Sequence, residues 1–136
     1  MKLKNFFITA LLSLLPLLSV AKKTPEAVSG PAIEFAETTH DFGTIPEKGG
    51  PVTYRFEFTN TGDAPLMIVN ATASCGCTRP DYPKKPVAPG KSAKIKVTYL
   101  PDGRPGEFTK TVTVKTNCKK QRKVTLKING FVNPAQ

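Results

Sequence analysis

The chain has 136 residues, of which 39% are hydrophobic, and it carries 20 Lys and Arg residues against 10 Asp and Glu. This length suits one domain that can bury a core without help from disulfides, and three cysteines are too few for a disulfide scaffold. The formal net charge of +10 favours anionic partners, although it is also what solvated strand faces produce. With one histidine, scattered carboxylates and no phosphate-cradling glycine motif, the sequence offers no catalytic acid–base set.

The first 21 residues have the pattern of a secretory signal peptide. Lys2 and Lys4 precede an apolar run over residues 6–20, and Ser19-Val20-Ala21 forms a small-residue cleavage site. The alternative is a retained anchor, but the run is shorter than the roughly 20 apolar residues that a spanning helix needs. We therefore predict a signal peptide over residues 1–21 and export to the periplasm or the cell exterior, with no transmembrane helix after cleavage.

Residues 22–31 are polar and contain Pro25, Gly30 and Pro31, which is typical of a flexible lead-in. Residues 32–133 then show apolar residues at every second position, in stretches separated by Gly, Pro, Asn and Asp. The stretch 66–73 is apolar on both faces, so we expect an interior strand there. Four prolines between residues 80 and 89 leave room for at most a short edge strand, and Gly130 is expected to permit a bulge.

About seven short strands with no helical period outside the signal peptide predict an all-β fold. The architecture we expect over residues 32–133 is an antiparallel Ig-like β-sandwich. The chain has no Trp, so the Cys…Trp…Cys core of antibody domains is absent.

Several short segments in this order resemble a bacterial exported domain family of unknown function that is marked by a Cys-Gly-Cys-Thr signature. The family is similar to Hydin-type and major-sperm-protein-like folds, and the resemblance covers about residues 33–132. It implies an Ig-like sandwich and an envelope location, and it supplies no substrate or catalytic residue. The segments that carry it are 61–66, 74–78, 87–91, 99–101, 106–108 and 128–130.

Cys75 and Cys77 form the most distinctive chemical element of the sequence. In a straight strand they would lie on one face, about 6.6 Å apart, so a bond between them needs a bend that Gly76 permits. Three interpretations stay open: a structural pair that pins a turn, a thiol–disulfide exchange site, or a site for a soft metal such as Cu(I) or Zn. His40 is the one histidine that could join them, and we expect it to be a turn or surface residue instead.

Cys118 is predicted to lie at the opposite end of the sandwich from the pair, on the order of 20 Å away, and unbonded to it. We expect it to be exposed, either as a reactive thiol that links two copies into a dimer or as an incidental cysteine. It lies in a basic run that is a candidate for binding a polyanion, the alternative being a solvated loop. The run consists of Lys115, Lys119, Lys120, Arg122 and Lys123.

Taken together, these features predict a non-enzymatic exported Ig-like module, with no cofactor, that associates with an envelope protein or an anionic envelope polymer. Exposed sheet edges suggest β-strand addition as the binding mode. Nucleic acid is not expected as a partner because no reading motif is present. The alternative function is thiol–disulfide exchange or soft-metal handling at Cys75 and Cys77.

Overall fold

The computed structural model describes residues 29–136, so the predicted signal peptide and most of the predicted lead-in lie outside the described residues. The described part is all-β, as predicted, and has no helix that could cross a membrane. Its eight strands are β1 (Ile33–Phe35), β2 (Thr39–Pro46), β3 (Val52–Asn60), β4 (Ile68–Ala73), β5 (Thr78–Asp81), β6 (Ser92–Tyr99), β7 (Gly106–Thr116) and β8 (Lys123–Asn133).

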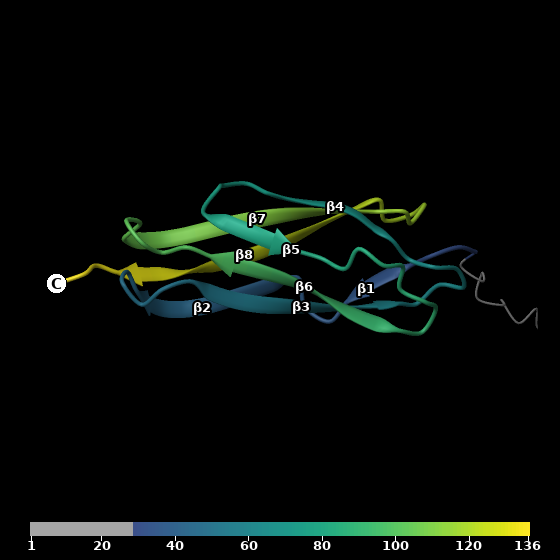
Figure 1. Cartoon of the computed structure of the whole chain (residues 1–136), viewed down its shortest axis with the longest axis horizontal. Helices are drawn as coiled ribbons and strands as arrows, with labels where there is room; N and C mark the ends of the chain where they lie inside the picture. Colours follow the sequence, from purple (N-terminus) through teal and green to yellow (C-terminus); the bar gives the residue numbers. More distant parts are fainter. Residues whose placement is uncertain (1–28) are drawn as a thin grey trace, which may run out of the picture.

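The strands form two four-stranded sheets that pack on one shared hydrophobic core. Figure 1 shows the strands running along the long axis of the molecule. One sheet has the order β1-β3-β6-β5 and the other the order β2-β8-β7-β4. All pairs are antiparallel except β2 with β8, which run parallel. The predicted Ig-like sandwich is therefore confirmed, with one strand more than expected and one parallel pair.

The alternating side chains explain how each strand contributes to the core. In β3, Phe56 and Phe58 are fully buried, whereas the intervening Glu57 is exposed. Their partners across the strand pair, Ile95 and Ala93 in β6, continue the same inner face. Burial of a large apolar side chain contributes about 1.5–3 kcal/mol, so this period-two pattern is enough to fix which face turns inward.

Two sequence-based expectations about individual strands are wrong. The stretch 66–73 is not an interior strand, because β4 lies at the edge of its sheet, and both Val69 in β4 and Met67 just before it are exposed. Gly130 does not carry a bulge, because β7 and β8 pair without interruption past it. The irregularity is in β2 instead, between Asp41 and Thr44, opposite Gly130.

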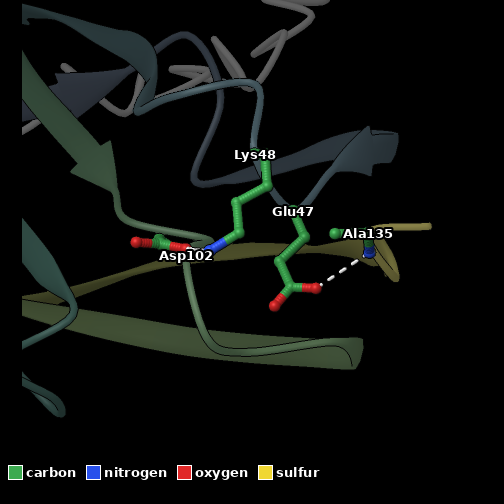
Figure 2. Close-up of polar contacts among 4 residues, drawn as sticks. All are labelled: Glu47, Lys48, Asp102 and Ala135. Carbon is green, nitrogen blue, oxygen red and sulfur yellow. Dashed lines mark hydrogen bonds and ion pairs between the residues drawn. The ribbon is translucent and has the colours of Figure 1, made fainter.

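The sandwich has two ends that differ in their turns. One end holds the turns after β2, β4 and β6 together with the end of β8. Figure 2 shows two contacts that the β2–β3 turn makes at this end. Lys48 pairs with Asp102 between the β2–β3 and β6–β7 turns, and Glu47 accepts a hydrogen bond from the Ala135 N–H. The opposite end holds the start of β1, the end of β3 and the β7–β8 loop.

Candidate functional sites at the two ends

Cys75 and Cys77 are joined by a disulfide in the turn where the chain crosses from β4 to β5, and so from one sheet to the other. Their Cα atoms lie 5.2 Å apart, closer than in an extended strand, because the chain bends at Gly76. As a disulfide, the pair offers no thiolates to a metal. Within residues 29–136, no three His, Cys, Asp or Glu side chains gather as a ligand set, and His40 stacks on Tyr54 instead.

The disulfide borders a hollow of about 270 Å³ at its end of the sandwich. Cys75 is half-buried and Cys77 is 1% exposed, so one sulfur atom is much easier to reach than the other. The Cys77 N–H donates a hydrogen bond of 3.1 Å to Cys75 Sγ. The remaining residues of the hollow are Tyr99, Arg104, Pro105, Glu107, Phe108 and Lys110.

Lys110 is the one charged residue in the inward-facing register of β7. The register residues Phe108, Val112 and Val114 are buried in the core, whereas Lys110 is half-buried and lines the disulfide hollow. Tyr99 stacks on Phe108 beneath the same hollow, with ring centroids 4.0 Å apart. Burial raises the pKa of Tyr99, and the positive charge of Arg104 opposes that rise.

Cys118 lies in the β7–β8 loop, at the opposite end of the sandwich, and is a free thiol. The prediction that it is exposed is wrong, because its side chain is 2% exposed and belongs to the hydrophobic core. The loop folds inward there because the Cys118 N–H donates to Thr116 Oγ1, which in turn donates to the Gln121 carbonyl. A dimer linked through Cys118 would require this loop to open, so the folded protein does not present that thiol to a second copy.

A groove of about 450 Å³ runs between the β1 segment and the β7–β8 loop. Ile33 and Cys118 are its buried apolar residues, and Lys119 and Lys120 stand exposed on the loop side. The predicted basic run is thus split by the fold. Lys115 and Lys123 pair across β7 and β8 as exposed residues outside the groove, and Arg122 is exposed at the end of the loop.

Residues 33–132 match a family model described as a protein of unknown function, DUF1573. The chain belongs to the DUF1573 family. The match spans all eight strands except the last residue of β8 and therefore includes both ends just described. No curated protein sequence matches this DUF1573 chain.

Solved structures confirm the fold of this DUF1573 protein at low sequence identity. A Porphyromonas gingivalis protein of unknown function is 15% identical with a TM-score of 0.67, covering 82% of this chain and 51% of its own, so the chain spans about half of that protein. The human CEP192 ASH/PapD-like domain 7 is 14% identical with a TM-score of 0.63, covering 100% of this chain and 99% of its own. The periplasmic chaperone SfaE is 15% identical with a TM-score of 0.51, covering 77% and 59% respectively.

Sequence reasoning found the cysteines and the basic run but missed what surrounds them. Arg104 and Glu107 come to the disulfide from the β6–β7 turn and the start of β7, far from it in sequence. The one available signal was Lys110, a charged residue in the otherwise uncharged inward-facing register of β7. No sequence pattern indicated the groove beside β1, because the groove depends on which strand lies at the edge of the sheet.

Proposed function

We propose that this DUF1573 protein is a non-enzymatic, exported protein-binding module that takes up an extended, acidic segment of a partner along the free edge of β1. The observation that carries this proposal is a groove next to β1, which is an edge strand of its sheet among the described residues. An extended segment would pair with β1 through its backbone and place alternate side chains in the groove.

Some backbone N–H and C=O groups of β1 do not pair with β3 and point toward the outer edge of the sheet. The hydrogen bonds from Thr61 N–H to the Ala32 carbonyl and from Ala36 N–H to the Glu57 carbonyl fix which pairs of β1 and β3 are bonded. By alternation, the N–H and C=O groups of Ile33 and Phe35 face away from β3. Within residues 29–136 nothing hydrogen-bonds to them. They are the groups that an added strand would use.

The other sheet edges are less suited to strand addition. In β4 the register shifts at Val69, and the outward N–H of Ala71 is taken by the side chain of Asn70. In β5 an outward position is Pro80, which has no N–H to donate. In β2 the register shifts after Asp41. Irregularities, prolines and side-chain caps of this kind are how proteins protect edges from pairing.

The charge of the groove supports an acidic partner. Lys119 and Lys120 are exposed on its loop side, and Glu34 is the one carboxylate among its lining residues. Exposed charges of this kind act mainly on the association rate and on the choice of partner, and their effect falls as salt is added. An anionic envelope polymer would meet the same lysines but would leave the β1 edge unpaired.

Export and the envelope location belong to this proposal. They are supported by the signal-like pattern of residues 1–21 and by a fold that is also the scaffold of a periplasmic chaperone. It also remains a prediction that Cys75-Gly76-Cys77-Thr78 is a signature motif of the family.

The test uses the mature chain and two synthetic eight-residue peptides, one alternating Val with Glu and one alternating Val with Lys. We expect the acidic peptide to bind about tenfold more tightly and to lose affinity as salt is raised. Amide exchange read by NMR should slow at Ile33 and Phe35, whereas Glu34, already paired with β3, should change little. A double variant Lys119→Glu/Lys120→Glu should abolish the preference for the acidic peptide.

The matched control is Lys115→Glu/Lys123→Glu, which makes the same charge change on exposed residues outside the groove. The proposal fails if both double variants reduce binding equally, since that would indicate attraction to the net charge. It also fails if the Ile33 and Phe35 amides are already protected in the free protein, because the edge would then be occupied by the chain itself or by a second copy.

A further inference from the structure

We propose that Cys75–Cys77 is a thiol–disulfide exchange site, in which Cys75 is the sulfur that a partner thiol attacks and Cys77 is the resolving sulfur. The substrate class is a thiol or dithiol of another protein or of a small molecule such as glutathione. This inference concerns the end of the sandwich away from the β1 groove and does not rest on the proposed protein-binding function.

A purely structural role explains the disulfide poorly. The two cysteines are separated by one residue, and in the chain-entropy account a cross-link constrains the unfolded chain least when it closes the shortest loop. The turn is also held by hydrogen bonds on both sides. The Ser74 N–H donates to the Thr111 carbonyl, and the Leu100 N–H donates to the Cys77 carbonyl, each at 2.9 Å. The turn would keep both anchors without the S–S bond.

The unequal exposure of the two sulfur atoms gives the site a direction. Cys75 is half-buried beside an open hollow, whereas Cys77 is 1% exposed and packs in the core. A thiol arriving from solvent therefore meets Cys75 first. Cys77 is accessible to Cys75 but not to a second partner, which is the arrangement that a resolving cysteine requires.

The surroundings of Cys75 favour its thiolate. The Cys77 N–H already points at Cys75 Sγ, and a hydrogen bond to sulfur stabilises the charged form. Arg104 and Lys110 line the same hollow and bring positive charge, opposed by the single carboxylate of Glu107. Tyr99 is the remaining titratable group there, and it is neutral at physiological pH, since burial raises its pKa further above the ordinary tyrosine value of about 10. Lys110 is the one charged residue in the inward-facing register of β7, and it lies beside the disulfide.

The exchange balances in two steps. A partner thiolate attacks Cys75 Sγ, the S–S bond breaks, and Cys77 leaves as a thiolate that takes up a proton. A second partner thiolate then attacks the partner-derived sulfur of the mixed disulfide. The bond to Cys75 breaks, and Cys75 leaves as a thiolate that takes up a proton. Two partner thiols become one disulfide, and their two electrons and two protons are held by Cys75 and Cys77. The reverse sequence oxidises the pair.

The test compares two variants in a Cys118→Ala background, which removes the third thiol. Each is exposed to oxidised glutathione, quenched with acid and read by intact mass. We expect Cys77→Ser, which leaves Cys75 free, to form the mixed disulfide at least about tenfold faster than Cys75→Ser, which leaves Cys77 free. Circular dichroism and urea unfolding show whether both remain folded. Equal rates in two folded variants would overturn the assignment of roles.

A second measurement stays informative if a variant unfolds. The wild-type protein is equilibrated in glutathione buffers that span reducing to oxidising ratios, and the reduced fraction is trapped by alkylation. An exchange site should settle at a mixture of oxidised and reduced forms within that range, whereas a structural disulfide should stay oxidised throughout. Full oxidation at every ratio would overturn the proposal.

The charged neighbours provide the third measurement. Lys110→Gln in the Cys77→Ser/Cys118→Ala background should raise the pKa of the Cys75 thiol and slow its reaction with glutathione several-fold at neutral pH. The matched control is Lys127→Gln, which removes one positive charge from an exposed position of β8 away from the hollow. If the control slows the reaction equally, net charge and not the site governs it, and the role of Lys110 is wrong.

Discussion

The two ends of the sandwich differ in whether their cysteines are oxidised and in how deeply their cysteines and lysines are buried. At the groove end, a reduced thiol, Cys118, is sealed in the core and the lysines stand in solvent above it. At the disulfide end, an oxidised pair reaches the surface through Cys75, and a lysine, Lys110, is drawn partly inside beside it. The comparison teaches that the local basic sequence around Cys118 says little about reactivity, because burial overrides it.

The two ends are also built differently. The groove end depends on a buried amide, Asn60, which holds the backbone around it, whereas the disulfide end depends on aromatic stacking and on contacts between turns. Substitutions confined to one end can break this comparison, and the two glycine substitutions Gly62→Ala and Gly130→Ala also measure whether the other end responds. If the ends are independent, stability changes at one should leave the chemistry of the other untouched.

The largest effect is expected from Asn60→Ala at the groove end. Asn60 is fully buried, and its side chain donates to the Ala64 and Val87 carbonyls and accepts from the Gly62 N–H, at 2.7–3.0 Å. Removing the amide leaves several of these groups without a partner in the interior. We expect a loss of about 3 kcal/mol in the free energy of unfolding, measured in urea. Asn70→Ala, an exposed amide on β4, is the control and should change stability by less than about 0.5 kcal/mol.

The next largest loss in the free energy of unfolding is expected from Gly62→Ala, which alters the segment leading into β1. A Cβ atom at Gly62 would lie 2.1 Å from the Gly30 carbonyl oxygen and 2.6 Å from the Ala32 nitrogen, so backbone must move. We expect a loss of about 2 kcal/mol and faster amide exchange at Ile33, with the redox equilibrium of the disulfide unchanged. A change in that equilibrium would show that the two ends are coupled.

The counterpart at the other end is Gly130→Ala. Its Cβ would lie 2.8 Å from both the Gly43 carbonyl oxygen and the ring of Phe108, which lines the disulfide hollow. Only one of these contacts is with backbone, and it is longer than the 2.1 Å contact at Gly62, so the loss should be about 1–2 kcal/mol, less than for Gly62→Ala. Here the disulfide should respond and the amide of Ile33 should not. The opposite pattern, read by the same two measurements, would contradict the division into ends.

The fold could be predicted from the sequence because alternation is a local signal that burial of large side chains enforces. The alternation was accurate for β3 and β6, where every second residue is buried or half-buried. It failed for β4, because an apolar run such as Leu66 to Val69 looks the same in an interior strand and in an edge strand with exposed Met67 and Val69. Sheet order, and with it the β1 edge and the hollow beside Cys75, depends on contacts between distant residues that no local pattern encodes.

A smaller effect is expected from Cys118→Ala. The side chain is buried, and its loss removes one sulfur atom from the core, which should lower the free energy of unfolding by about 1 kcal/mol. In the wild type, Cys118 should react with a thiol reagent only at the rate at which the β7–β8 loop opens, and many-fold faster in urea. Rapid reaction under native conditions, or a disulfide-linked dimer under air, would contradict the buried thiol.

Tyr99 should make the disulfide end sensitive to alkaline pH. Because burial raises its pKa in the folded state, the folded protein holds that proton more tightly than the unfolded chain does. Its contribution to stability is therefore complete below the ordinary tyrosine pKa of about 10 and is lost as the pH rises through the higher folded value. Between about pH 9 and pH 11.5, wild type should lose more stability than Tyr99→Phe. Equal losses would mean that Tyr99 ionises without cost.

The smallest effect on stability is expected from Lys48→Ala, which removes the ion pair with Asp102 shown in Figure 2. Hydrogen bonding to Lys48 lowers the pKa of Asp102, so the pair favours the folded state above the ordinary Asp pKa of about 4 and loses that effect as the pH falls below it. Both side chains are exposed, and salt screens such pairs, so urea unfolding at neutral pH should show no measurable change. Asp102 nevertheless lies in the β6–β7 turn, two residues before Arg104, which lines the disulfide hollow. We therefore expect the Cys75 reaction with glutathione to slow slightly while stability stays constant, and a rate identical to wild type would show that Arg104 needs no such support.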